Sequence, residues 1–480
     1  MSKLTETLYP YQKEDVAFML SHRRCLNGNS MGLGKTIETL ATLEQQNPRH
    51  VLIVCKKTYI SEWWSQIQDW LGQDCLTPWD GVGDRLDGLD LAGPPFVCVN
   101  YDLLSIPKYW HELIKVRWDA IVFDEAHKLK NYKAQRTKNA FLMSPHTDRI
   151  YHLTGTPIQN SPADLYPLFH LMNPREYHNY HWWINTFCVM EEKEIWMKSK
   201  NGGRPFPRTV RNIVSGAKNH EAELNQLLHL YMCRHEKSEV MPNLPPKQRR
   251  VVPVELGPER TQYLQMQEKF FALLDSGESI TAPAVIAQMI RLRQICLEPN
   301  LLSHEPMKPS TPSNKTQALL DLLEDTNEKV LVFSFFEQYI RILSQVLDDK
   351  DIKHVTITGK RTPTENMTAE RAFQNDSEVR VCLGTIGSMG ECWTLTKAKI
   401  VVFVDVFWNP AINEQCEDRS YGRANKGLEQ SESVLIIDLF NRGTIEEHVH
   451  NIVRRKEKMI DAIVSKDYAY EVVESMRRTR

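Results

Sequence analysis

The sequence has no excess of charge of either sign. Lys and Arg together number 59, and Asp and Glu 61, among 480 residues, which gives a formal net charge of −2. This balance excludes a globally positive field that would draw the whole molecule onto nucleic acid. Any contact with DNA must therefore be confined to basic groups gathered on one surface.

Two further absences concern paired cysteines and long apolar runs. The ten cysteines form no C-x-x-C pair and no Cys/His cluster with zinc-ligand spacing, which favours reduced thiols in a cytosol-like compartment. The N-terminal stretch MSKLTETLYPYQKEDVAFML carries charged and polar residues where a signal peptide needs an apolar core. No stretch approaches the ~18 apolar residues of a membrane span. We expect a cytoplasmic protein that is not secreted and has no membrane partner.

The composition, with 41% hydrophobic and 25% charged residues, is that of a globular protein, and fixed-period repeats and low-complexity tracts are absent. At about 150 residues per domain, the length predicts roughly three domains or subdomains. Short apolar, β-branched runs alternate with helix-length stretches in two parts of the chain, which predicts an α/β fold with two parallel sheets. These runs lie at 51–55, 96–100, 120–124 and 149–155, and again at 329–336, 354–359, 379–384, 399–407 and 433–440.

Between the two groups of runs, from about 160 to 310, apolar residues follow helical spacing and prolines interrupt the pattern. This stretch predicts a helical insertion that ends in a linker. The expected parts of the chain are a first lobe at 1–165, the insertion and linker at 166–310, a second lobe at 311–445, and a helix with a basic tail at 446–480.

The strongest local motif is MGLGKT at 31–36. Gly32 and Gly34 let the backbone curl so that successive N–H groups face a phosphate, while Lys35 meets the β- and γ-phosphates and Thr36 ligates Mg²⁺. Asn29 stands where the full G-x-x-x-x-G-K-T pattern has its first glycine, so the motif alone leaves an ordinary glycine-rich turn open. The predicted nucleotide-binding residues of the loop are Met31, Gly32, Leu33, Gly34, Lys35 and Thr36.

A second motif, DEAH at 124–127, directly follows the apolar run AIVF. This places Asp124 at the carboxyl end of a strand, where it can hold Mg²⁺, with Glu125 beside it to orient or deprotonate the attacking water. Adjacent carboxylates alone are more often a solvated turn. Together with an upstream GKT they predict ATP hydrolysis with Lys35, Asp124 and Glu125 as catalytic residues. His127 is assigned to coupling between the lobes.

Ordered motifs along the chain resemble those of superfamily 2 helicase-like ATPases. They are LYPYQKEDV, MGLGKT, VLIVC, DEAHKLKN, LTGTPIQN, KVLVFSFF, GSMGECWTLTKA, WNP and QCEDRSYGR. Three blocks and the WNP narrow the resemblance to the SNF2 family of double-stranded-DNA translocases, namely RHEKSEVMPNLPPK, LRQICLEP and GTIEEHVHNIVRRKEKMIDAIV. The resemblance covers about residues 8–465, and the chain is similar in its compactness to annealing-helicase-like and bacterial or phage members.

The resemblance implies two RecA-like lobes with protrusions and a C-terminal brace helix. It also implies a monomeric motor that uses ATP and Mg²⁺, hydrolyses ATP on double-stranded or branched DNA, and translocates without conventional strand separation. Matching motifs place Tyr11 and Gln12 near the adenine, Thr154, Gly155 and Thr156 between nucleotide and DNA, Gln415 near the nucleotide, and Arg419 and Arg423 as catalytic arginines near the γ-phosphate. The DNA-binding candidates by the same comparison are Lys56, Lys57, Thr58, Lys130, Asn131, Thr385, Ser388 and Trp408.

Other segments allow two interpretations. The stretch 198–218 carries six basic residues and no acidic one, and is either a DNA-ordered loop or a solubilising one. The tryptophan-rich pieces at 61–70 and 180–187 could stack on bases. We favour packing in the core, since Trp63 and Trp70 lie seven positions apart on one predicted helix face.

The chain departs from the family pattern at three places. Asn29 and Ser30 replace an acidic pair, and Cys392 and Trp393 replace a glycine and an aliphatic residue. The final arginines are four positions apart rather than three, so a register with Arg423 and Lys426 stays open. Two alternative functions remain: a strand-separating superfamily 2 helicase or restriction-type motor, and a DNA-binding scaffold with a decayed ATPase.

Overall fold

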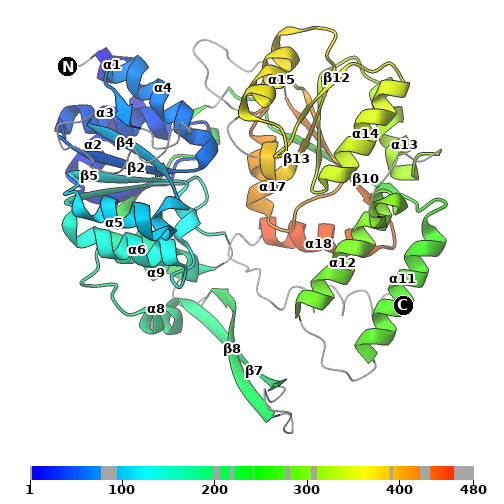
Figure 1. The fold of residues 1–480 in the computed structure, drawn as a ribbon, viewed down its shortest axis with the longest axis horizontal. Helices are drawn as coiled ribbons and strands as arrows, with labels where there is room; N and C mark the ends of the chain where they lie inside the picture. Colours follow the sequence, from blue (N-terminus) through cyan, green and yellow to red (C-terminus); the bar gives the residue numbers. More distant parts are fainter. Residues whose placement is uncertain are drawn as a thin grey trace. The chain divides into compact units, whose positions relative to one another are not determined.

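The computed structural model describes residues 3–76, 95–159, 161–197, 206–216, 221–241, 243–275, 282–303, 311–389, 393–421 and 433–458. The chain divides into two compact units. Unit 1 consists mainly of Met1–Met190 and Ile213–Pro242, and unit 2 mainly of Asn243–Ile460 with Glu191–Asn212. Figure 1 shows each unit as a sheet with helices packed against it. Within the described parts of the chain, no helix is long and apolar enough to cross a bilayer.

Unit 1 contains a seven-stranded sheet in the order β3-β4-β2-β5-β6-β1-β9, in which every neighbouring pair is parallel. Its strands are β1 (Arg24–Asn27), β2 (Val51–Cys55), β3 (Cys75–Leu76), β4 (Phe96–Asn100), β5 (Ala120–Asp124), β6 (Arg149–Leu153) and β9 (Met232–Cys233). Its helices are α1 (Lys3–Thr7), α2 (Pro10–Ser21), α3 (Lys35–Gln46), α4 (Ile60–Leu71), α5 (Pro107–Lys115), α6 (Gln135–Met143), α7 (Tyr166–Met172), α8 (Tyr180–Phe187), α9 (Glu221–Tyr231) and α10 (Lys237–Val240).

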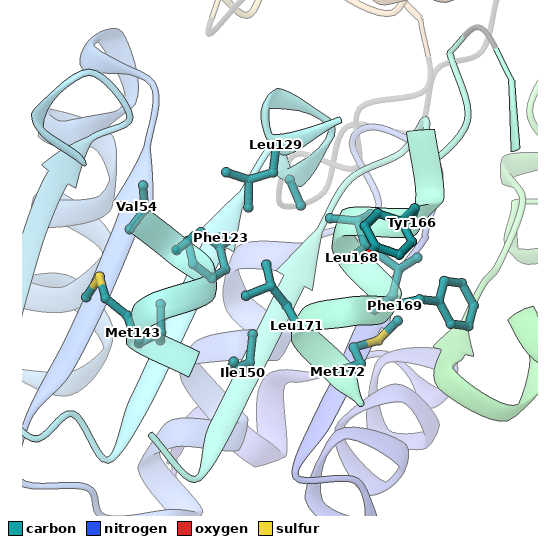
Figure 2. Close-up of a cluster of buried hydrophobic side chains, with 14 of the residues drawn as sticks. Val54, Phe123, Leu129, Met143, Ile150, Tyr166, Leu168, Phe169, Leu171 and Met172 are labelled. Atoms are coloured by element: carbon teal, nitrogen blue, oxygen red, sulfur yellow. The ribbon is translucent and has the colours of Figure 1, made fainter. Parts of the chain in front are cut away.

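The central strands of unit 1 are buried on both faces, as their continuous apolar runs predict. Alternate residues of one strand belong to different clusters: Leu52 and Val54 pack in one, and Val51 and Ile53 in the other. Figure 2 shows part of the first cluster, where side chains from β2, β5 and β6 meet those of α6 and α7. The two clusters hold the carboxyl ends of these strands in fixed positions at one edge of the sheet.

Unit 2 contains a six-stranded parallel sheet in the order β10-β15-β14-β11-β13-β12. The strands are β10 (Gln248–Val254), β11 (Val330–Ser334), β12 (His354–Ile357), β13 (Val381–Thr385), β14 (Ile400–Phe403) and β15 (Leu435–Asn441). The helices are α11 (Arg260–Asp275), α12 (Ala282–Leu297), α13 (Asn314–Glu324), α14 (Glu337–Asp349), α15 (Pro363–Asn375), α16 (Ile386–Met389), α17 (Pro410–Glu417) and α18 (Ile445–Lys458).

The predicted α/β fold with two parallel sheets is confirmed, and every apolar run named from the sequence contains a strand. The insertion differs in part from its helical expectation. It contains α7 to α12, but also a two-stranded sheet of β7 (Cys188–Met197) and β8 (Phe206–Gly216) and the edge strands β9 and β10 of the two larger sheets. Within β8 the run TVRNIV contains four β-branched residues, which favour a strand, although it lacks a clear alternation of polar and apolar residues.

Candidate active site

The phosphate loop connects β1 to α3 in unit 1. Gly32 and Gly34 have φ angles of 84° and 91°, which only glycine adopts readily, and Gly34 caps the first turn of α3. A Cβ atom at Gly34 would lie 2.4 Å from Gln12 Nε2, so the helix α2 also requires glycine here. The predicted loop therefore forms, with Lys35 and Thr36 at the N-terminus of a twelve-residue helix. An N-terminus of this kind attracts anions.

The two residues expected on the adenine side lie against this loop. The Tyr11 hydroxyl donates to the Leu33 carbonyl at 2.8 Å, and the Gln12 side-chain amide donates to the same carbonyl at 2.9 Å. The ammonium of Lys35 donates to the carbonyl oxygens of Asn29 at 2.7 Å and Ser30 at 3.3 Å. Tyr11, Gln12 and Lys35 therefore all contact the backbone of one short turn.

The acidic pair lies where β5 ends. Asp124 Oδ2 accepts a hydrogen bond from Trp63 Nε1 at 2.9 Å, and the Asp124 carbonyl accepts one from the Tyr101 hydroxyl at 2.7 Å. Glu125 has φ 52°, a left-handed conformation that non-glycine residues rarely adopt, and its backbone N–H donates to Asp124 Oδ1. Such local strain is typical of functional sites.

The two carboxylates have opposite pKa shifts. Burial and then the charge of Glu125 raise the pKa of Asp124. Burial alone would raise the pKa of Glu125 too, but the hydrogen bond from His127 and the positive charges of His127, Lys56 and Lys35 outweigh burial and lower it. The surroundings of Glu125 therefore favour its ionised form more strongly than those of Asp124 do. The same electrostatic effects indicate that Lys35 lies near both acids.

The TGT segment after β6 contacts both motifs. His127 Nδ1 lies 3.2 Å from Glu125 Oε2 and 3.1 Å from Thr154 Oγ1. A Cβ atom at Gly155 would lie 3.0 Å from Met31 Cγ, so this glycine permits close approach to the phosphate loop. The structure thus brings the loop, the acidic pair and the TGT segment together within unit 1. The Thr156 backbone N–H donates to Thr154 Oγ1 at 3.2 Å and orders the turn.

The DNA-binding candidates of unit 1 flank this site. Lys57 and Thr58 are exposed in a short helix after β2, whereas Lys56 is half-buried and its charge acts on Glu125. Lys130 donates to Gln159 Oε1 at 2.7 Å, and Asn131 is exposed.

The tryptophan-rich pieces contain both buried and exposed rings. Trp63 and Trp183 are buried, which agrees with the predicted packing in the core, but Trp64 and Trp182 are 40% and 45% exposed.

In unit 2, Gln415 lies in α17 and Arg419 in the turn after it. The Arg419 side chain is only 1% exposed, and its Nε donates to the Gln415 carbonyl at 3.0 Å. Arg423 and Lys426 lie outside the described residues, as do Cys392 and part of the basic stretch, at 198–205 and 217–218. Trp393 donates from Nε1 to the Ser388 carbonyl at 2.9 Å.

The carboxyl ends of strands in unit 2 carry the remaining DNA-binding candidates. Thr385 Oγ1 donates to Ser388 Oγ at 2.9 Å after β13, and Trp408 follows β14. Arg293 of α12 lies over the Trp408 ring at 5.3 Å and donates from Nη2 to Asp405 Oδ2 at 3.0 Å. α12 therefore holds the loop that bears Trp408.

Several residues of the site were not predicted as functional. Trp63 and Tyr101 contact Asp124, which is 61 and 23 positions away in the sequence. Arg293 contacts Trp408 and also Asp405, which is 112 positions away. The sequence offered a packing role for Trp63 and placed Arg293 in the block LRQICLEP that carries the family resemblance, but it offered no signal for Tyr101. Their partners depend on which strands lie side by side.

Known proteins resemble this chain over its whole length. Residues 11–301 match the model of the SNF2-related domain, and residues 314–425 match the helicase conserved C-terminal domain. Mouse DNA annealing helicase and endonuclease ZRANB3 is 26% identical over 467 residues, which cover 95% of this chain and 41% of that protein. The Xenopus tropicalis SWI/SNF-related matrix-associated actin-dependent regulator of chromatin subfamily A-like protein 1 is 27% identical over 466 residues, or 96% of this chain and 45% of that protein.

The chain thus spans less than half the length of these two relatives. Among solved structures, the Sulfolobus solfataricus SWI2/SNF2 ATPase core in complex with dsDNA has 22% sequence identity and a TM-score of 0.44, covering 98% of this chain and 96% of that one. The SNF2-related model alone matches more than half of the chain, and the helicase model follows it. The chain therefore belongs to the SNF2 family of helicase-like ATPases, which have two RecA-like lobes.

Proposed function

We propose that the protein is a DNA-stimulated ATPase that translocates along double-stranded DNA and remodels branched DNA or protein–DNA complexes without conventional strand separation. The observation that supports this most is the meeting of three motifs in unit 1. Gly155 lies against Met31 of the phosphate loop, and His127 joins Glu125 to Thr154. A change at the nucleotide can thus pass directly to the segment beside the predicted DNA contacts.

The residues of unit 1 divide the chemistry between them. The backbone N–H groups of the loop and the Lys35 ammonium would bind the phosphates. Thr36 and Asp124 would hold Mg²⁺, which would supply positive charge beside the transferred phosphoryl group. His127, Lys56 and Lys35 favour the ionised form of Glu125 by lowering its pKa. This form can orient the attacking water and accept its proton as hydrolysis proceeds, although the lowered pKa makes it a weaker base. Tyr11 and Gln12 position the adenine.

Unit 2 contributes the groups that sense closure of the two lobes. Gln415 contacts the nucleotide, and Arg419 and Arg423 stabilise charge on the γ-phosphate only when the lobes meet, which links hydrolysis to movement. The DNA candidates of both lobes hold the phosphate backbone without reading bases. Branched DNA is included because the mouse relative is named a DNA annealing helicase.

Phosphate release measured without DNA and with double-stranded, single-stranded or branched DNA tests this proposal. We expect strong stimulation by double-stranded or branched DNA, together with displacement of a third strand from a triplex. Unwinding of a forked duplex would instead favour a strand-separating helicase. A protein that binds DNA but shows no stimulated hydrolysis would favour a scaffold.

Glu125→Gln tests the assignment of the base. We expect at least a ~10²-fold loss of DNA-stimulated turnover with ATP binding retained, because the amide cannot accept the proton. The matched control is Glu14→Gln, the same change on the exposed face of α2. Normal turnover in a clean Glu125→Gln preparation would refute the mechanism.

A further inference from the structure

Asn29 stands where the family pattern has an acidic residue, just before the phosphate loop in the sequence, and it is completely buried. Its side-chain Nδ2 donates to Asp15 Oδ2 of α2 at 2.7 Å and to Glu38 Oε2 of α3 at 3.2 Å. Its Oδ1 accepts a hydrogen bond from the His235 backbone N–H at 2.7 Å. One side chain therefore connects the adenine-side helix, the phosphate-side helix and the segment after β9.

The backbone of Asn29 reaches the catalytic loop as well. Its carbonyl oxygen accepts the hydrogen bond from Lys35 Nζ at 2.7 Å, and its N–H donates to Asn27 Oδ1 at 3.1 Å. Because the acceptor of the Lys35 ammonium is the backbone of residue 29, a displacement of the Asn29 side chain also displaces the group that orients Lys35.

The segment after β9 follows the loop closely. β9 pairs in parallel with β1, and the contact continues beyond the strands, with Gly28 N–H donating to the Cys233 carbonyl at 2.8 Å and Ser30 N–H to the His235 carbonyl at 3.0 Å. A Cβ atom at Gly28 would lie only 2.6 Å from Met232 Sδ, so any other residue here would displace the Met232 side chain. The segment 232–235 is where the chain returns from α9 of the insertion.

The side chain at position 29 both donates and accepts hydrogen bonds, which an amide can do and an ionised carboxylate cannot. Asp15 and Glu38 are 2% and 0% exposed, and both need a donor. Burial raises the pKa of Asp15, so even one ionised carboxylate is costly there. An ionised carboxylate at position 29 could donate to neither acid and would add a negative charge to this buried acidic cluster.

We propose that Asn29 is a positioning residue for nucleotide binding, which fixes the phosphate loop and Lys35 and joins them to the segment through which the chain returns from the insertion. The proposal rests on the assignment of Lys35 to the nucleotide phosphates. Asn29 and its neighbours thus connect the insertion to the phosphate loop, because a movement of residues 232–235 would displace Gly28, Asn29 and Ser30.

Asn29→Asp tests the side chain, since it keeps the size and removes the donor. We expect the Kd of Mg–ATP, measured by titration without DNA, and the KM for ATP to rise about tenfold or more, with kcat less affected. In the exchange variant D15N/N29D the amide and the carboxylate swap positions and the total charge stays as in the native protein. We therefore expect this variant to recover most of the lost affinity, which a general loss of stability would not allow.

His235→Pro and His235→Ala test the segment and need no change at Asn29. Proline removes both the ring and the backbone N–H that donates to Asn29, whereas alanine removes only the ring, whose Nε2 lies 3.4 Å from Asp15 Oδ1. We expect a higher Kd in the proline variant than in the alanine variant. Asn139→Asp is the matched control in α6, where the Asn139 amide is buried and donates to the Leu104 carbonyl at 2.6 Å. It should lower the melting temperature without changing the Kd.

Native Kd values in Asn29→Asp and His235→Pro, or no recovery in D15N/N29D, would overturn the inference. The binding titration contains no DNA, so its result does not depend on DNA stimulation. A native protein that binds Mg–ATP but is not stimulated by DNA would contradict the proposed function alone.

Discussion

At the scale of single residues, the carboxylate Asp124 depends on a partner 61 positions away in the sequence. Trp63 is 1% exposed and packs under the sheet, yet its ring N–H reaches Asp124 Oδ2. The bond fixes the orientation of the carboxylate proposed to hold Mg²⁺. Residues that support a metal ligand in this way commonly affect metal affinity when they are changed.

Trp63→Phe should therefore weaken the response of the ATPase to Mg²⁺. We expect the Mg²⁺ concentration needed for half-maximal turnover to rise about tenfold, within the ~10–100-fold range seen for such partners. A Mg²⁺ titration at saturating ATP and DNA measures this change.

Trp183→Phe provides the matched control for that titration. Trp183 is equally buried in unit 1 and donates from Nε1 to the Pro162 carbonyl at 2.9 Å. Both substitutions should lower the free energy of unfolding by a similar amount, on the order of 1–3 kcal/mol. Equal Mg²⁺ dependence of the two variants would show that the Trp63 bond has no role in the site.

At the scale of elements, Arg293 connects α12 to the loop after β14. The guanidinium is 1% exposed, pairs with Asp405, donates to the Val406 carbonyl at 2.6 Å and lies over the rings of Phe335 and Trp408. Asp405 also accepts a hydrogen bond from Ser334 Oγ at 2.6 Å, at the end of β11. This pair therefore fixes the loop that presents a predicted DNA contact.

Arg293→Met should destabilise the protein by about 3–5 kcal/mol, because it leaves the buried Asp405 carboxylate without its cation. The double variant R293M/D405N should lose less, since no buried charge remains. Denaturant unfolding measures both. Arg291→Met, the same change at an exposed position of α12, should alter the free energy of unfolding by less than about 0.5 kcal/mol. Equal stabilities of all three variants would exclude a structural role for the ion pair.

At the scale of the whole molecule, the near balance of charge is compatible with DNA binding through local contacts. Basic and acidic residues number 59 and 61, so the proposed attraction to DNA must come from a few groups such as Lys57 and the DNA-binding candidates of the second lobe. Each neutralised phosphate releases counterions, which makes binding sensitive to salt.

We expect the affinity for a duplex to fall steeply with salt, with a slope of log K against log salt of about −0.9 for each phosphate contacted. Fluorescence anisotropy at several salt concentrations gives this slope. Lys57→Gln should reduce its magnitude by about one unit, whereas Lys115→Gln, in the exposed part of α5, should leave it unchanged. Affinity that ignores salt would contradict a phosphate-based contact.

Much of the local structure of this protein follows from its sequence, with the strands of the insertion as the exception. The runs VLIVC and AIVFD are strands because continuous apolar, β-branched residues suit a strand buried on both faces. The turn MGLGKT could be assigned because glycine conformation and helix start are decided within a few residues. The order of such motifs also carried the family resemblance, which the match of residues 11–301 confirms.

The contacts between residues that are distant in the sequence follow from the fold alone. The strand β9 lies beside β1, and the His235 backbone contacts Asn29 across 206 positions, because the insertion returns to the edge of the sheet. Likewise, the parallel neighbours β2 and β5 bring Lys56 near Glu125. Local spacing cannot specify these contacts, since they depend on the order of strands and on how the chain crosses between them. The contacts that hold the phosphate loop and Asp124 in place therefore depend on the fold.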